Sequence, residues 1–547
     1  MWTKEQLEAI NKEGNLLVSA AAGAGKTAVM TERIVRIITE GTKVEELLVV
    51  TYTKPAAAEM KQRIEKRLSE LCDEEKDSEK KKLLTVAAGS ISRANISTIH
   101  SFCSAVLKRN YHRLGIDPAF RIGDDAETQL LRNEALEEAM EEFYIEAEKN
   151  RDPASEFIKY VLDGNDGLSA LITSVYNFII ARPDPKRWLE KAVENYGEGF
   201  DEASKIAGGF IIREARRALG AAGRLCEKAY NEFFPILQGK ETGYLNILSE
   251  DKQLIDTLCA MESYEKWQRV LENYKKPVLK VGNMKAPDGL KTYRKQYSAV
   301  VDEVKKNFAF SIETEKKSAE AFRPVLEKLS AIVLDFMDRY AEKKQQEALV
   351  DYSDLEQMAL TALGYEDAAE EFKRKFKYIF VDEYQDTNLV QDNIIAKISR
   401  GDNLFMVGDV KQSIYRFRQA EPASFLEKYR KYDGSIGTRI DLNNKLRSCT
   451  AILNAANTLF SKLMLGEVGE IDYSDNAALR PGENRASGKV ELVLIERTEQ
   501  SYREAVGEGE AADDDDDGDG AFDELNSVEA EAAFIADKIR ELIVKVV

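Results

Sequence analysis

The sequence predicts an α/β fold with a parallel β-sheet and a large all-helical insertion. Short apolar runs rich in β-branched residues recur towards both ends of the chain, with helical patterns between most of them. Strands buried on both faces of a parallel sheet have this composition. From about Asp124 to Gln346 the chain is instead rich in Glu, Lys, Ala and Leu at helical spacing. Strands resume afterwards, so the helical segment interrupts an α/β domain.

Seven segments are predicted to be strands, and each ends in polar or small residues. They are residues 15–20, 47–53, 94–100, 378–383, 403–409, 439–444 and 490–496. Near the end of the chain, residues 528–547 have apolar side chains four and three positions apart in alternation. That spacing predicts an amphipathic helix.

Composition argues against several classes of protein. The chain has 547 residues, 44% hydrophobic and 32% charged, and a net charge of −19, which argues against a uniformly basic nucleic-acid-binding protein. No apolar run approaches the roughly 20 residues of a transmembrane helix, and the N-terminus lacks the pattern of a signal peptide. Five scattered cysteines without a CxxC pair indicate neither a disulfide framework nor a zinc or iron–sulfur site. We therefore expect a cytoplasmic protein with no membrane partner.

Charge is unevenly distributed along the chain. Residues 496–531 contain fifteen acidic and two basic residues, which predicts a solvated linker; a metal site at Asp513 to Asp517 is the weaker alternative. Residues 275–297 contain seven basic residues and one acidic residue, with tyrosines interleaved. This segment is either a solvated connection between helices or a patch that binds nucleic-acid phosphates.

The strongest local motif is AAAGAGKT, which follows a predicted strand and precedes a helical pattern. That context is the one a P-loop requires. The glycines let backbone N–H groups approach phosphate oxygens, Lys26 can reach the β- and γ-phosphates, and Thr27 can ligate Mg²⁺. Alanine occupies position 20, where the strict pattern has glycine. The predicted ATP-binding residues of this loop are Ala20, Ala21, Ala22, Gly23, Ala24, Gly25, Lys26 and Thr27.

A P-loop needs a second carboxylate for its metal ion, and the apolar run YIFVDE supplies one. Asp382 suits the Mg²⁺ shell, while Glu383 suits a base that orients and deprotonates an attacking water. The two motifs together predict an ATPase that uses ATP and Mg²⁺.

Five motifs occur in an order that resembles the superfamily 1 DNA helicases of the UvrD/RecB group, whose motor domains are RecA-like P-loop NTPase domains. They are the P-loop, TYTKPAAAEMKQR (51–63), STIHSF (97–102), VDEYQDTN (381–388) and VGDVKQSIYRFRQA (407–420). The start WTKEQLEAI, the sequence around the P-loop and DYSDL (351–355) are similar to the AddA (RexA) family of helicase–nuclease subunits. His100 and Asp382 are 282 positions apart, which resembles the large insertion of AddA and RecB rather than the smaller one of UvrD.

The resemblance implies roles for further residues. Gln6 matches a glutamine that recognises adenine, and Gln412 matches one that senses the γ-phosphate. Arg447 matches an arginine that reaches the γ-phosphate, although Leu446 replaces the aromatic residue that usually precedes it. The predicted catalytic residues are thus Lys26, Asp382, Glu383, Gln412 and Arg447. The predicted DNA contacts are Thr51, Thr53, Lys54, Thr98, His100, Ser101, Phe102, Tyr415, Phe417 and Arg418.

By resemblance, the parent protein is an ATP-dependent 3′→5′ DNA helicase and exonuclease of double-strand break repair and recombination. Its expected partners are single-stranded DNA, single/double-strand junctions and an AddB (RexB)-type subunit. Later helicase motifs and nuclease carboxylates are absent, so we interpret the chain as an N-terminal fragment. One alternative is a UvrD-like or RecB-like helicase; another is an ATP- and single-stranded-DNA-binding module without its own turnover.

Four segments follow from the motifs and the helical pattern. Residues 1–123 are the N-terminal part of the first RecA-like motor domain, and residues 124–346 are the helical insertion. Residues 347–436, with the Asp-Glu motif, complete that motor domain. Residues 437–547 are part of a second RecA-like motor domain and include the acidic linker 496–531.

Overall fold

The computed structural model describes most of the chain up to residue 464 and short segments after it. The described residues are 2–162, 167–237, 239, 242–281, 284–445, 448–464, 473, 478–481, 489–493, 531–532 and 534–543. They form two compact units, Met1–Ser448 with Ala456–Glu483, and Cys449–Ala455 with Asn484–Val547. In the second unit residues 534–543 are helical, while α19 (Thr450–Leu463) has residues in both units.

A six-stranded parallel sheet is the centre of the first unit, with strand order β3-β2-β6-β7-β1-β8. In β1, Val18 lies between Val407 of β7 and Ile440 of β8. The prediction of an α/β fold on a parallel sheet is therefore confirmed. The strands are β1 Leu16–Ala20, β2 Leu47–Thr51, β3 Asn95–Thr98, β6 Tyr378–Val381, β7 Leu404–Gly408 and β8 Thr438–Leu442.

Alternate residues of the four central strands β1, β2, β6 and β7 enter two separate cores, one on each face of the sheet. Val18, Val49 and Val407 pack in the core that α1 to α4 cover, while Leu48 and Met406 pack in the core of the opposite face. This alternation explains why these four strands are apolar on both faces. The helices of the two faces are α1 Lys4–Asn11, α2 Lys26–Thr39, α3 Lys54–Glu74, α4 Ser78–Ser90, α5 Ile99–Leu114, α15 Tyr352–Ala362, α16 Glu366–Lys375, α17 Leu389–Ile398 and α18 Pro422–Lys431.

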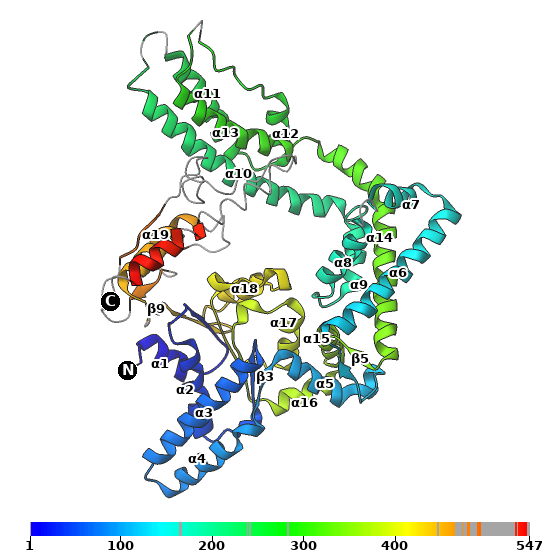
Figure 1. Ribbon diagram of the computed structural model, residues 1–547, viewed down its shortest axis with the longest axis vertical. Coiled ribbons are helices and arrows are strands. Elements are labelled where there is room, and N and C mark those ends of the chain that lie inside the picture. The colour runs from blue at the N-terminus through cyan, green and yellow to red at the C-terminus, as the bar shows by residue number, and fades with distance from the viewer. Residues whose placement is uncertain are drawn as a thin grey trace. The chain divides into compact units, whose positions relative to one another are not determined.

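Between the two parts of the sheet the chain is helical, as predicted. One helical core is made by α10 to α13, and a second by α6 to α9 with α14; in Figure 1, α11 and α13 lie along the long α10. The helices are α6 Asp125–Asn150, α7 Pro153–Phe157, α8 Gly167–Ile179, α9 Pro185–Glu194, α10 Phe200–Phe233, α11 Thr242–Cys259, α12 Tyr264–Asn273, α13 Asp288–Lys306 and α14 Ile312–Gln346.

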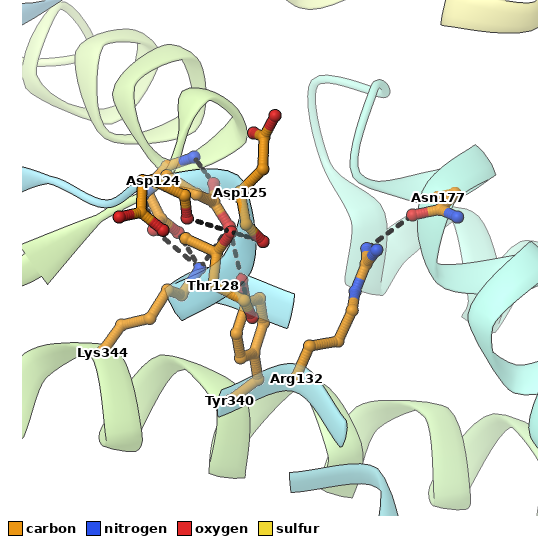
Figure 2. A network of polar contacts seen from close by, with 9 residues as sticks. Asp124, Asp125, Thr128, Arg132, Asn177, Tyr340 and Lys344 are labelled. Atoms are coloured by element: carbon orange, nitrogen blue, oxygen red, sulfur yellow. Dashed lines mark hydrogen bonds and ion pairs between the residues drawn. The ribbon is translucent and has the colours of Figure 1, made fainter. Parts of the chain in front are cut away.

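A polar network fixes the end of α14 to the start of α15. Lys344 of α14 is buried and donates hydrogen bonds to Asp351 and Asp354, which form the capping box of α15. Tyr340 donates to Asp351 and to the backbone oxygen of Thr128 in α6, at 3.1 and 3.4 Å (Figure 2). A two-stranded parallel sheet of β4 (Arg121–Ile122) and β5 (Leu349–Val350) lies at the same junction. The helical segment is thus attached to the sheet domain through α15 as well as through the chain itself.

Two details of the prediction need correction. Strand β8 lies in the segment assigned to the second motor domain, yet it pairs with β1 at the edge of the first sheet. Residues 490–493 of the predicted strand 490–496 are not in a strand, and the remaining three residues lie outside the described ones. The acidic linker 496–531 likewise lies outside them, apart from residue 531. A short pairing of β9 (Asn444–Lys445) with β10 (Arg480–Pro481) follows β8.

The basic segment 275–297 is partly neutralised by its own surroundings. Arg294 is buried and pairs with Asp251, with Nε and Oδ2 2.9 Å apart. Lys291 pairs with Asp288. Tyr297 is 1% exposed, so its ring is unavailable to a nucleic-acid base. These contacts favour a structural role for the C-terminal part of this segment.

Candidate nucleotide site and adjoining groove

The predicted chemical groups follow the strands at one edge of the sheet. The P-loop follows β1, Asp382 follows β6, and Asp409 follows β7. Thr51 ends β2 and Thr98 ends β3. Because all these strands are parallel, their carboxyl ends lie at the same edge, which is where α/β sheets bind ligands.

The P-loop has the backbone conformation that only glycine adopts without strain. Gly23 and Gly25 have φ of 79° and 88°, and Gly25 is the N-cap of α2. The loop alanines Ala20, Ala21 and Ala24 are buried in the core beneath it. Lys26 and Thr27 are the first two residues of α2, whose N-terminal N–H groups favour an anion. The loop is therefore suited to hold phosphate oxygens.

Gln6 lies behind the P-loop and supports it. Its side chain is buried, its Nε2 donates to the backbone oxygen of Ala24 at 3.0 Å, and its Oε1 accepts from Thr3 N. A Cβ on Gly25 would lie 3.1 Å from Gln6 Nε2, so the loop and the amide are tightly packed. A small cavity beside Gln6 is also lined by Asn444.

A charge cluster lies between the P-loop and the end of β6. Lys26 Nζ is 2.8 Å from Glu383 Oε2, and the Lys26 side chain is only 12% exposed. Glu383 has a φ of 49°, a conformation that is strained for a non-glycine residue and often marks a functional site. Burial, and next the charge of Glu383, raise the pKa of Asp382 to about 6. The pKa of Asp386 is raised to about 6 by the same two causes.

This donor set fits a magnesium ion that is shared with a nucleotide. Among the described residues no group of three or more His, Cys, Asp or Glu side chains could hold a metal by itself. Mg²⁺ at nucleotide sites is usually bound by one or two protein oxygens together with substrate phosphates and water. Asp382 offers a buried carboxylate for this purpose, and Thr27 offers a hydroxyl beside Lys26 at the start of α2.

Gln412 lies near the same cluster, in the short 3₁₀ helix η7 (Val410–Gln412). Its Nε2 donates to Asp409 Oδ2 at 2.6 Å, and Asp409 also pairs with Lys411. Asp409 is buried, so this arrangement fixes the Gln412 amide to the end of β7. Arg447, the remaining predicted catalytic residue, lies outside the described residues.

A groove of about 480 Å³ adjoins the charge cluster. It extends from Asp382 and Glu383 past the C-terminal end of β2 and the first turn of α5 to the short 3₁₀ helix η8 (Arg416–Arg418). His100 lines it, with its Nε2 3.0 Å from Glu356 Oε1 and its ring 4.8 Å from that of Tyr352.

Aromatic rings stand at the η8 end of the groove. Tyr52 and Tyr415 are stacked with their ring centroids 4.9 Å apart, and Phe417 lies against Tyr415. Arg418 donates to the Tyr52 hydroxyl at 3.1 Å, and its guanidinium lies over the rings of Tyr415 and Phe417. Phe417 is 74% exposed. Such a platform of exposed rings and a guanidinium suits stacking against bases of any sequence.

Of the other predicted DNA contacts, some are exposed and some are buried. Thr53 and Lys54 are exposed at the start of α3, and Ser101 is exposed on the first turn of α5. Thr51 and Thr98 are buried; Thr51 donates to Thr53 O, and Thr98 caps α5 by accepting from Ser101 N.

Phe102 is a core residue, so its predicted DNA contact is wrong. It is 5% exposed and packs edge-on against Phe372 and Phe376. The sequence carried this signal, because Ile99, Phe102 and Cys103 follow the spacing of one apolar helix face.

Sequence reasoning missed several groove residues, among them Tyr52, Tyr352 and Glu356. Tyr52 lies inside a motif already recognised, between two threonines that the resemblance assigned to DNA contacts. Tyr352 and Glu356 lie in and just after the DYSDL motif, in α15. Glu356 is buried and accepts from Asn388 and Gln391 as well as facing His100. No linear pattern identifies it, since its partners come from two other helices.

Comparisons with known proteins agree with the motifs. Residues 2–433 match the sequence family described as the UvrD/REP helicase N-terminal domain. The chain is 37% identical to an ATP-dependent helicase/nuclease subunit from Alkaliphilus metalliredigens, across 99% of this chain and 45% of that protein. It is 35% identical to the protein of the same description from Syntrophomonas wolfei, across 99% of this chain and 46% of that protein. The predicted resemblance to AddA is confirmed, and the chain spans a little under half the length of these relatives. None of the helices in the described part of the chain is long and apolar enough to cross a membrane.

Proposed function

Because the chain belongs to the UvrD/REP helicase N-terminal domain family, we propose that it is the ATP-hydrolysing motor part of a DNA helicase. We propose further that the whole gene product is an AddA-type helicase–nuclease subunit that moves 3′→5′ along single-stranded DNA during double-strand break repair. The similarity to helicase/nuclease subunits over nearly the whole chain supports this assignment.

The observation that carries the proposal is the position of the charge cluster between a phosphate loop and an aromatic groove. Lys26 and Glu383 are 357 positions apart in the sequence and form an ion pair at the P-loop. The groove that begins at Asp382 and Glu383 reaches Phe417 and Arg418. One edge of the sheet would thus hold both the nucleotide and a single strand of DNA.

The residues of the cluster divide the chemistry between them. A phosphate oxygen replaces Glu383 as the partner of Lys26 when ATP binds, which frees the Glu383 carboxylate. Glu383 then orients the attacking water and takes its proton. Asp382 and Thr27 would hold Mg²⁺, which supplies positive charge for the phosphates. Gln412, which donates to Asp409, would contact the γ-phosphate.

Single-stranded DNA would lie in the groove, with bases stacked on Phe417, Tyr415 and Tyr52. Lys54, Thr53, Ser101 and His100 would contact its backbone. The further partners that the AddA resemblance implies are a single/double-strand junction and an AddB-type subunit.

Phosphate release with and without single-stranded DNA tests this function. We expect the whole gene product to hydrolyse Mg·ATP and an oligonucleotide such as dT₃₀ to stimulate the rate at least about tenfold. ATP and DNA binding without stimulated turnover would instead indicate a binding module. Failure to bind either ligand would contradict the proposal altogether.

A further inference from the structure

We propose that Gln385 is a positioning residue that couples the nucleotide site to the DNA groove, an inference that rests on the proposed function. Gln385 is in the 3₁₀ helix η6 (Tyr384–Asp386) and is 2% exposed. Its Nε2 donates to Glu383 Oε2 at 3.0 Å and to Asp386 Oδ2 at 3.1 Å. Its Oε1 accepts from the backbone N–H of Asp409 at 2.9 Å. One buried amide thus joins the expected base to the end of β7.

Only a carboxamide can make this set of contacts. Its nitrogen donates to two carboxylates, while its oxygen accepts from a backbone N–H. A glutamate at this position would place a third negative charge beside Glu383 and Asp386, and an apolar side chain would leave the Asp409 N–H without its partner. The full use of the amide means that neither end can move without breaking a buried hydrogen bond.

Each end of the Gln385 amide leads to one of the two ligand sites. At the nitrogen end, Glu383 Oε2 is shared with Lys26, the residue expected to turn towards phosphate. At the oxygen end, Asp409 begins η7 and holds Gln412, and the chain then continues to Tyr415 and η8 in the groove. When Lys26 leaves Glu383, Gln385 becomes the side chain that still donates to Glu383 Oε2. Gln385 therefore holds that carboxylate while keeping it connected to the segment with the base-stacking rings.

Gly408 supports the same conclusion independently. A Cβ added at Gly408 would overlap Gln385 Oε1, and it would also lie 3.1 Å from the Phe425 ring. Gly408 has no positive φ, so its backbone conformation does not require glycine. The absent side chain leaves the space into which the Gln385 oxygen fits.

The test measures how nucleotide changes DNA affinity. Fluorescently labelled dT₃₀ is titrated into the whole gene product with and without saturating Mg·AMP-PNP, and the ratio of the two Kd values is the coupling factor. We expect the wild type to have a ratio at least about fivefold from unity, within the usual range of allosteric coupling. Gln385→Met should bring the ratio to within twofold of unity, while the Kd values for AMP-PNP alone and for DNA alone change less than threefold. Its kcat for DNA-stimulated hydrolysis should fall at least tenfold, with the KM for ATP unchanged.

Two further variants keep the inference falsifiable. Gly408→Ala, which displaces the Gln385 oxygen without removing the amide, should lower the coupling factor in the same direction. Gln268→Met, which makes the same chemical change on a half-buried glutamine of α12, should leave the coupling factor unchanged. The inference is overturned if the wild type shows no coupling, if Gln385→Met retains it, or if Gly408→Ala retains it where Gln385→Met does not fold. Loss of ATP and DNA binding in the wild type would instead contradict the proposed function.

Discussion

The nucleotide end and the groove end of the sheet edge are built from different contacts. At the nucleotide end, Lys26, Glu383 and Gln385 form a cluster of charges and amides in which Lys26 and Gln385 are largely removed from water and Glu383 is half-buried. At the groove end, Phe417 and Arg418 are exposed and make ring and guanidinium contacts. Buried charges select one ligand geometry, because each unpaired group costs free energy. Exposed rings accept any base, as a motor that moves along DNA requires.

Replacing Lys26 should separate the two ends most clearly, because it should lower the affinity for ATP and not the affinity for DNA. Lys26→Ala removes the cation that faces the phosphates and leaves Glu383 without its ion-pair partner. We expect Mg·ATP affinity to fall at least about a hundredfold, since charge-assisted contacts are the strong ones at such sites. Single-stranded DNA affinity without nucleotide should change less than threefold. Titration calorimetry measures the ATP affinity and fluorescence anisotropy the DNA affinity, with Lys12→Ala at the exposed C-cap of α1 as the matched control. Unchanged ATP affinity would remove the basis for assigning the P-loop.

Substitutions in the groove should lower the affinity for single-stranded DNA and not the affinity for ATP, and the loss should be smaller than that of Lys26→Ala. Phe417→Ala removes an exposed ring, so we expect single-stranded DNA affinity to fall about tenfold, within the ~1–3 kcal/mol of one base stack. Tyr52→Ala should act in the same direction, because it removes the ring beneath Tyr415. Affinity for ATP should not change. Phe234→Ala, on a similarly exposed phenylalanine beyond α10, is the control. Equal losses in Phe417→Ala and Phe234→Ala would contradict the groove assignment.

A third expected effect concerns the stability of the folded protein without nucleotide. The pKa of Asp382 is raised to about 6, chiefly by burial, above the usual ~3.9 of an exposed aspartate. The folded state therefore holds this proton more tightly than the unfolded state, and it loses stability as pH rises from about 4 to about 6. Asp382→Asn should remove this loss and stabilise the apo protein by ~1–3 kcal/mol at pH 8, with little gain at pH 4.

Thermal unfolding at the two pH values checks this prediction. We expect Asp382→Asn to have a higher Tm than the wild type at pH 8 and nearly the same Tm at pH 4. Asp402→Asn, which changes an exposed carboxylate, should show no such dependence on pH. An equal gain at both pH values would show that the buried charge of Asp382 is not the cause.

A region is easier to predict from the sequence when the residues in contact are close together along the chain. The P-loop is one strand, one turn and one helix in succession, so its glycines and Lys26 could be recognised locally. The Lys26–Glu383 pair joins residues 357 positions apart and was not predicted; the sequence predicted only that the two motifs serve one ATPase, and the parallel strands bring them to the same edge. Which side chain faces the groove was harder to predict. Within recognised motifs, Phe102 turned out to be core and Tyr52 to be surface, because the rotation of α5 and the turn after β2 decide this.

Long-range pairing was the least predictable feature. The apolar pattern identified β8 as a strand, but no pattern within residues 438–442 specifies that β1 is its partner. The hydrogen bonds of Gln385 were also not foreseen, since they depend on the space left by Gly408. In both cases the information lies in the sequence of the partner element.

The most direct test of the whole account is the turnover of Glu383→Gln. This change keeps the size of the side chain and its ability to accept from Lys26, but it removes the base. In the whole gene product with saturating single-stranded DNA, Mg·ATP should still bind with a Kd within about threefold of the wild type. Steady-state phosphate release should fall ~10²–10⁴-fold, the usual contribution of a general base. Phosphate release within a few-fold of the wild-type rate would show that Glu383 does not activate the water, and the central claim would be wrong.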